Sequence, residues 1–297
     1  MPAPYLDPDW KNLKKKNSDH QGNLDAVEYS TTFSNVTFLV FGPLMTFLMH
    51  PYIQKRSRYI YVLFILFTIT GLFSMYFHMT LSFLGQMLDE IAILWLLASG
   101  YSIWLPCCYF PTFLGQNRSW YISLIVTITL VSTCLSFLKP TINAYALNTI
   151  GLHIVYIVVQ EYKKLRGSCK NSTESCVPFT QILPTSPRGS ILCNYMTKNK
   201  ELRHLIEVST VIWALAITSW ISDRLFCSFW QWINFPYLHG IWHVLISFTF
   251  PYGMVILALV DSTYEMPDQT IKVRYWPRDT WPVGLPYVEL GDDHKSC

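Results

Sequence analysis

The stretch Tyr237-Leu-His-Gly-Ile-Trp-His-Val-Leu-Ile-Ser-Phe-Thr-Phe-Pro251 opens the last apolar segment of the chain and contains two histidines, His239 and His243. In a helix, residues four apart lie on one face, with Cβ atoms about 5–6 Å apart. Two imidazoles in this arrangement can share one metal ion, and His-x-x-x-His on a helix is a recurrent zinc half-site. The alternative is a pair of core histidines that are hydrogen-bonded to neighbouring helices.

The composition is that of an integral membrane protein. The 297 residues are 51% hydrophobic and only 14% charged, with a mean hydropathy of +0.26, whereas a soluble domain carries about 25% charged residues. A membrane-spanning helix needs about 20 mostly apolar residues. The sequence therefore predicts an all-α fold, a seven-transmembrane-helix bundle. The segments expected to span the membrane are 32–50, 59–81, 87–106, 119–138, 142–160, 205–222 and 238–260.

The same pattern sets the expected division of the chain. We expect a polar N-terminal segment at 1–28, a transmembrane domain at 29–261 and a C-terminal tail at 262–297. The tail is aromatic and basic, which suits a segment at the membrane interface. Within the transmembrane domain, residues 167–197 are rich in Ser, Thr, Asn and Pro, which predicts a flexible loop.

Lys and Arg are distributed unequally between the two sides of the predicted membrane. Sixteen of the 22 lie on the side of the C-terminus and six on the other side. The positive-inside rule then places the C-terminus in the cytosol and the N-terminus in the lumen. Asn117 and Asn171, both in Asn-x-Ser/Thr acceptor sequences, would face the cytosol and stay unmodified. Asn35, in a third such sequence, lies too close to the first apolar segment for ready glycosylation.

A third histidine lies in the segment 59–81, four residues after a serine, so that Ser74 and His78 share one face of the expected helix. We expect a short connection after this segment and a new helix that begins at Met87. His78 and Asp89 then lie about 4–6 Å into their helices, measured from the same side of the membrane. The segment with the first two histidines also enters from that side.

Three histidines, a serine and an aspartate are therefore expected at one membrane depth. Taken singly, Ser74 could be a helix serine bonded back to its own backbone, and Asp89 a carboxylate favoured by the helix dipole, a role that suits Glu90 better. Ionisable side chains at membrane depth are usually functional. Three protein ligands with an open fourth position describe a catalytic zinc site, whereas a structural zinc site is closed by four ligands.

This spaced set of residues resembles that of the alkaline ceramidases, which belong to a superfamily of membrane hydrolases that includes the adiponectin-receptor-like proteins. Two longer blocks, Glu28-x-x-x-Thr-x-Ser34-Asn35 and Ser222-Asp223-Arg224, favour the ceramidases within that superfamily. The resemblance covers roughly residues 28–166 and 198–290. It implies a seven-helix membrane enzyme.

The resemblance also implies a role for each residue of the set. His78, His239 and His243 would bind Zn²⁺, Ser74 would support the metal site and the oxyanion, and Asp89 would transfer the proton. The implied activity is a zinc-dependent amidohydrolase that cleaves the N-acyl bond of ceramide to sphingosine and a free fatty acid. Its partners would be ceramide and other membrane sphingolipids, in the endoplasmic reticulum or Golgi membrane. No nucleic acid is expected, and the sequence indicates no protein partner.

The chain departs from the family at the N-terminus. The family binds Ca²⁺ through an acidic Asp-Trp-Cys-Glu stretch before the first helix, together with a glutamate that Glu28 matches. That stretch is absent here, since Asp9-Trp10 is followed by Lys-Asn, which argues against a complete calcium site.

Two alternative functions stay open: a seven-helix receptor or sensor with a structural metal, and a catalytically weakened ceramidase. Asp89 beside three histidines, with no fourth protein ligand, favours an enzyme.

Overall fold

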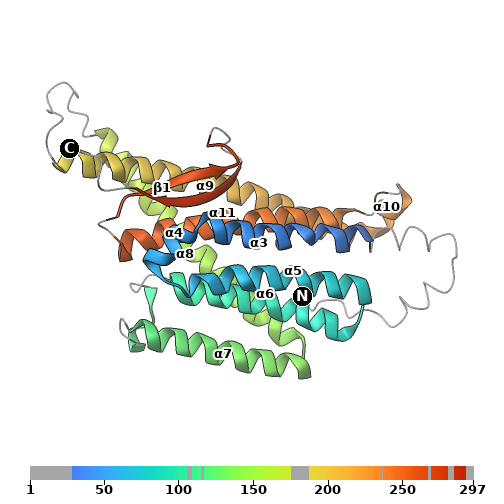
Figure 1. Cartoon of the computed structure of the whole chain (residues 1–297). Coiled ribbons are helices and arrows are strands. Elements are labelled where there is room, and N and C mark those ends of the chain that lie inside the picture. The colour runs from blue at the N-terminus through green and yellow to red at the C-terminus, as the bar shows by residue number, and fades with distance from the viewer. Residues whose placement is uncertain are drawn as a thin grey trace, which may run out of the picture.

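The computed structural model describes residues 29–291, except 106–108, 115–116, 175–186, 234, 236, 267–268 and 280–283. It is a bundle of long helices that run roughly along one axis (Figure 1). Within the described residues, seven helices are long and apolar enough to cross a membrane, which confirms the predicted seven-transmembrane-helix fold. Four of these spans are Tyr29–Leu48 (the first span), α5 (Ile60–Thr80), α6 (Phe83–Trp104) and α7 (Arg118–Leu138). The other three are parts of longer helices: Thr141–Gln160 in α8 (Thr141–Glu174), Lys200–Leu225 in α9 (Pro187–Leu225) and Leu238–Ser262 in α11 (Leu238–Glu265).

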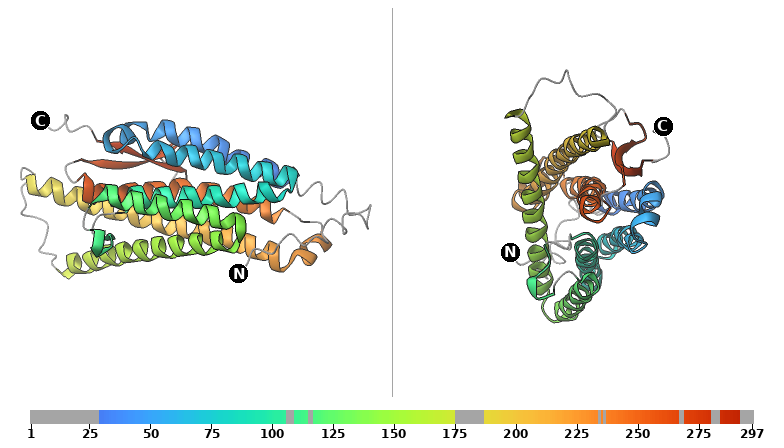
Figure 2. Two further views of the ribbon diagram at one scale, coloured as in Figure 1. Left: turned by 90° about the horizontal axis from the view of Figure 1, so that it is seen from below. Right: turned by 90° about the vertical axis from the view of Figure 1, so that its left-hand side faces the viewer.

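Shorter elements complete the fold. They are α3 (Val36–Leu48), which is the second part of the first span, η2 (Thr112–Leu114), α4 (His50–Arg56), α10 (Cys227–Trp232), β1 (Ile271–Trp276) and β2 (Leu285–Leu290). Of the seven spans, α11 buries the largest share of its residues. Seen end-on, the other helices lie around it (Figure 2), and it contacts α9, α3 and α6 directly. The helix that carries two of the predicted ligands is therefore the central element of the bundle.

The first span and α5 approach each other closely because glycines face the contact. A Cβ atom added at Gly71 would lie 2.4 Å from Cβ of Phe38, and one at Gly42 would lie 2.0 Å from Oγ1 of Thr68. Small residues allow transmembrane helices to pack backbone against backbone. This packing brings the end of α5, where His78 lies, beside the start of the first span.

The connection between α5 and α6 is shorter than the sequence predicted. Leu81 adopts the left-handed conformation with φ of 48° after the end of α5, and α6 begins at Phe83, not at Met87. The reason is an N-cap: the Ser82 hydroxyl accepts a hydrogen bond from the Gly85 amide at 3.0 Å, which satisfies an amide of the first turn.

The predicted loop at 167–197 is helical at both ends. Helix α8 continues to Glu174 and α9 begins at Pro187; residues 175–186 lie outside the described part of the chain. Proline is favoured at the first position of a helix because it has no N–H to leave unpaired, so the proline here starts a helix and does not mark a loop.

The C-terminal tail adds strands to an otherwise helical fold. Antiparallel strands β1 and β2 pair from Ile271 with Leu290 to Trp276 with Leu285, and the hairpin packs on α9, α4 and α11 (Figure 1). The sequence predicted that this tail lies at the membrane interface; the two strands were not predicted, and they leave the mostly helical fold unchanged. Leu285, Pro286 and Val288 of β2 are buried, so apolar contacts of this strand hold the hairpin on the bundle.

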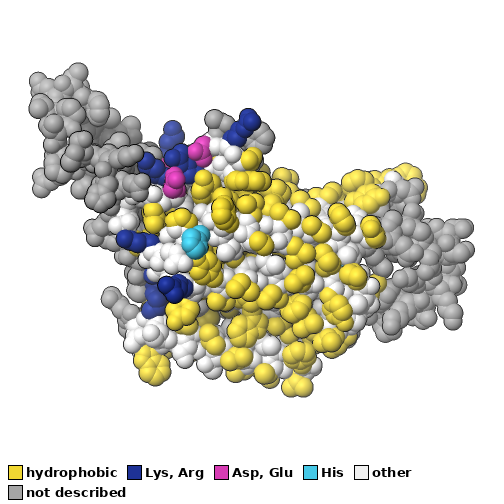
Figure 3. Space-filling model, viewed as in Figure 1, with side chains coloured by type: hydrophobic (Ala, Val, Ile, Leu, Met, Phe, Trp, Pro, Cys, Tyr) yellow, Lys and Arg dark blue, Asp and Glu magenta, His cyan; other side chains and the backbone are white. Residues whose placement is uncertain are grey.

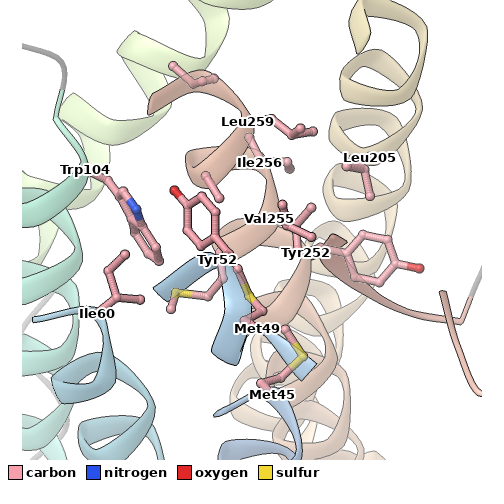
Figure 4. Close-up of a cluster of buried hydrophobic side chains, with 14 of the residues drawn as sticks. Met45, Met49, Tyr52, Ile60, Trp104, Leu205, Tyr252, Val255, Ile256 and Leu259 are labelled. Atoms are coloured by element: carbon pink, nitrogen blue, oxygen red, sulfur yellow. The ribbon is translucent and has the colours of Figure 1, made fainter. Parts of the chain in front are cut away.

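The main hydrophobic core lies at the end of the bundle that the hairpin covers. Tyr52, Trp104, Val255 and Leu259 are almost fully buried there, and Figure 4 shows them between α4, α6 and α11. The Tyr252 hydroxyl donates a hydrogen bond of 2.9 Å to the carbonyl of Gly284, beside β2. The apolar packing that stabilises the bundle is therefore concentrated at the end opposite the turn between α5 and α6.

Basic side chains gather at the same end. Figure 3 shows Lys and Arg over β1 and α4, and hydrophobic side chains over the rest of that face. Lys55 and Arg56 lie in the last turn of α4, and Lys272 and Arg274 lie in β1. This asymmetry agrees with the distribution of charge along the sequence.

An ion pair fixes α4 to α11 within this core. Nε of Arg56 lies 2.6 Å from Oδ2 of Asp261, and Nη2 lies 3.0 Å from Oδ1. The Asp261 side chain is 0% exposed and that of Arg56 is 15% exposed. A two-point contact of this kind needs both partners, because a carboxylate left alone in the core is strongly unfavourable.

We therefore expect Arg56→Met to destabilise the protein by about 3–5 kcal/mol, measured by thermal denaturation of the purified protein in detergent. Arg203→Ala is the matched control, because its pair with Glu207 has half-exposed side chains on both sides and such pairs contribute little. Equal melting temperatures for Arg56→Met and the wild type would show that the pair does not hold the fold together.

Candidate metal centre

Three histidines meet at the end of the bundle opposite the main core. His78 comes from the last turn of α5, and His239 and His243 come from the first two turns of α11. One ring nitrogen of each lies within 4.8 Å of the others, and the ring centroids are 4.8–5.2 Å apart. The structure thus brings together residues that are 161 positions apart in sequence (His78 and His239).

His243 is the most deeply enclosed of the three. It is 2% exposed, against 9% for His78, and the side chain of His239 is 18% exposed. Nδ1 of His243 lies 2.9 Å from the hydroxyl oxygen of Ser34 and 3.3 Å from the carbonyl oxygen of Thr31. Because Nδ1 has these two partners, Nε2 is the nitrogen of His243 that remains available to a metal ion.

A break in the first span supplies these contacts. Asn35 is in a turn between two helical parts, and its amide donates to the carbonyl of Thr32 at 3.3 Å. The carbonyl of Thr31 accepts from side chains instead, namely the Ser34 hydroxyl at 2.7 Å and the Asn35 amide group at 3.1 Å. Asn35 is itself 0% exposed, so its acceptor sequence is inaccessible in the folded protein.

His239 faces a carboxylate from a different helix. Nδ1 of His239 lies 3.6 Å from Oδ2 of Asp223, which is in the last turn of α9. This is an ion-pair distance, longer than a hydrogen bond. The sequence analysis singled out Ser34 and Asp223 only as members of longer blocks and predicted no role at the site for either of them.

Ser74 and Asp89 lie side by side next to the histidines. Ser74 is six residues before the end of α5 and Asp89 is six residues after the start of α6, so both are about 9 Å from the turn that joins these antiparallel helices. The Ser74 hydroxyl is close enough to the Asp89 carboxylate to interact with it. Ser74 also precedes His78 by one helical turn on the same face.

The donor set suits Zn²⁺. Imidazole nitrogen binds zinc at about 2.0–2.1 Å in tetrahedral geometry, and three imidazole nitrogens within 4.8 Å of one another can surround one such ion. Asp89 is not part of the group whose ligand atoms lie within 4.8 Å of one another. Across the described ranges, the site offers three histidine ligands and two nearby carboxylates, Asp89 and Asp223. Glu28, the predicted calcium ligand, lies outside these ranges.

Comparisons with known proteins agree on one family. The profile of the Ceramidase family matches residues 19–289. Alkaline ceramidase 1 of Homo sapiens is 66% identical over 270 residues, which cover 91% of this chain and 90% of that protein. Alkaline ceramidase 1 of Mus musculus is 58% identical over 280 residues, covering 94% and 91%. Alkaline ceramidase of Drosophila melanogaster is 30% identical over 269 residues, covering 91% and 84%.

We expect His78→Ala, His239→Ala and His243→Ala each to abolish zinc binding, because a site with three protein ligands has no redundancy. Metal analysis of the purified proteins measures this directly. His50→Ala is the control, since that histidine contacts Tyr61 at the other end of the bundle. Full zinc occupancy in His239→Ala would contradict the ligand assignment.

Proposed function

This chain belongs to the ceramidase family of hydrolases, and on that premise we propose that it is a zinc-dependent intramembrane amidohydrolase. It cleaves the N-acyl bond of ceramide to sphingosine and a free fatty acid. The observation that carries the proposal is the convergence of three histidine nitrogens within 4.8 Å, one helical turn from the Ser74 and Asp89 pair. The names of the relatives support ceramide as the substrate.

The protein residues divide the chemistry between them. When bound by His78, His239 and His243, zinc supplies Lewis-acid activation of a water molecule and of the scissile carbonyl. Asp89 accepts the proton of the attacking water and delivers it to the leaving amine. Ser74 donates a hydrogen bond to the oxygen of the carbonyl as negative charge develops on it. Before the substrate arrives, the Ser74 hydroxyl lies beside the Asp89 carboxylate, and its single proton turns to the carbonyl oxygen once Asp89 has taken the proton of the water.

The depth of the site suits a lipid with its polar group at the membrane interface. His239 is one residue and His243 five residues from the start of α11, which places them about 1.5 and 7.5 Å along the helix. The amide of ceramide lies just below the headgroup, while both hydrocarbon chains extend toward the middle of the bilayer. The lipid can therefore reach the site from the side without leaving the membrane.

An apolar groove beside the site can hold one of these chains. It has a volume of about 750 Å³ and runs between the first span and α11. Its walls include Phe33, Ile241 and Leu245, and Ser34 lines it on the side of the metal centre. We assign this groove to a hydrocarbon chain of the substrate, because it is almost entirely apolar and because Ser34, which lines it, contacts His243.

The receptor alternative is less well supported, because the similar proteins carry the name of a hydrolase. Calcium binding stays a prediction that the described residues do not test, and with it the idea of a weakened enzyme. The turnover of a ceramide with a fluorescent acyl chain, by membranes that contain the protein, tests the proposed activity. A run over a series of acyl-chain lengths gives the chain preference.

We expect Asp89→Asn to retain zinc and to lose turnover by a factor of about 10²–10⁴, since the amide keeps the shape of the side chain but cannot accept the proton. Zinc content and ceramide turnover are measured on the same preparation. Glu90→Gln is the control, because this neighbouring carboxylate accepts a hydrogen bond from Gln86 at 3.0 Å and has no role in the proposal. Proportional loss of zinc and turnover in Asp89→Asn would make Asp89 part of the metal site.

The orientation follows from the charge asymmetry: we propose that the basic end faces the cytosol and that the metal centre lies toward the lumenal side of the endoplasmic reticulum or Golgi membrane. Asn117 is at the cytosolic end, where it caps α7, and Asn171 is in the part of α8 that follows the span Thr141–Gln160. We expect neither to be glycosylated. A glycosidase-sensitive mobility shift that disappears in Asn171→Gln would reverse the orientation and move the site to the cytosolic side.

A further inference from the structure

We propose that Ser34 and Asp223 are positioning residues for the metal ligands: they hold Nδ1 of His243 and of His239, so that Nε2 of both histidines faces the metal. The inference rests on the proposed zinc site and goes beyond it. Neither residue belongs to the set of predicted ligands or catalytic groups. The evidence is the position of the proton on each imidazole, which follows from the contacts of Nδ1.

The contacts of His243 fix the position of its proton. A carbonyl oxygen only accepts, so the contact of 3.3 Å between Nδ1 and the carbonyl of Thr31 requires a proton on Nδ1. The Ser34 hydroxyl has one proton and donates it to the same carbonyl at 2.7 Å. Its oxygen therefore accepts from Nδ1 at 2.9 Å. Both contacts give the same tautomer, in which the lone pair is on Nε2.

The contact of His239 also favours a proton on Nδ1. The carboxylate of Asp223 can only accept when ionised, and at 3.6 Å from Nδ1 of His239 its charge favours a proton on that nitrogen without a direct hydrogen bond. The distance is longer than in the first contact, and we expect the weaker effect here. Histidines that bind metals almost always donate their second N–H to a carboxylate, a carbonyl or water.

These contacts come from two elements that do not themselves supply a ligand. Ser34 is in the first span and Asp223 is at the end of α9, and both lie against α11. The side chains of His239 and His243 could otherwise turn about their own bonds, since one helix alone does not set the orientation of a ring. Packing of the first span and α9 on α11 thus sets the ring orientation at the metal centre.

The test measures the zinc affinity of the purified full-length protein by competition with a chromophoric chelator. We expect Ser34→Ala to weaken zinc binding about 10–100-fold. Ser34→Thr keeps the hydroxyl and should retain the affinity, since Ser34 lines the open groove, where an added methyl group has space. Ser30→Ala is the matched control, one turn earlier in the same groove.

Asp223→Ala should weaken zinc binding less than Ser34→Ala, and Asp223→Asn less again, because the amide oxygen still accepts a hydrogen bond. Arg224→Gln is its control, as that side chain lies over the ring of Trp220. Thermal denaturation of the metal-free proteins separates a loss of fold from a loss of affinity. A Ser34→Ala protein that melts like the wild type and binds zinc more weakly supports positioning.

The outcomes distinguish the two proposals. If the wild type binds no zinc, or binds it independently of His78, His239 and His243, the proposed function fails. If the wild type binds zinc through these histidines while Ser34→Ala and Asp223→Ala keep its affinity, the positioning role is wrong and the zinc enzyme stands. Equal weakening by Ser34→Thr and Ser34→Ala would also overturn the role of the hydroxyl.

Discussion

The arrangement of the site depends on one constraint: an imidazole inside an apolar helix bundle must have partners for both of its nitrogens. A buried polar group without a hydrogen bond costs several kcal/mol in hydrocarbon. His243 meets half of this requirement through Ser34 and Thr31, and the other half is left for a shared ion. The turn at Asn35 is part of the same arrangement, because the Asn35 backbone amide bonds to Thr32, while the carbonyl of Thr31 lies 3.3 Å from Nδ1 of His243.

The groups that stabilise the bundle and the groups proposed for catalysis lie at opposite ends of it. The buried aromatic core, the ion pair between Arg56 and Asp261 and the β-hairpin all lie at one end, and the histidines lie at the other. Helix α11 joins the two ends, since Val255 and Asp261 belong to the core and His239 and His243 to the site. The core packing and the ion pair hold the C-terminal part of α11. They position its first turns while leaving the histidines free of large packed side chains from that core.

The sequence predicted the spans well because lipid leaves few alternatives: every backbone N–H must be paired within a helix. It also predicted which residues share a helical face, since Ser74 and His78, or His239 and His243, are related by local geometry alone. Ser34 and Asp223 escaped prediction because their contacts join helices that are distant in sequence or depend on side-chain rotation. The strands of the tail were not predicted, because aromatic and basic residues are compatible with both an interfacial segment and a β-hairpin.

Ser34 links the two parts of the proposed enzyme. Its hydroxyl accepts from His243 at 2.9 Å, and the same residue lines the groove assigned to a hydrocarbon chain. A chain in the groove would therefore press on the turn that orients a metal ligand. The free energy of binding along the apolar part of the lipid can then be used to hold the reacting centre in its active geometry. On this argument, a substrate with a shortened chain on that side loses turnover rate as well as affinity.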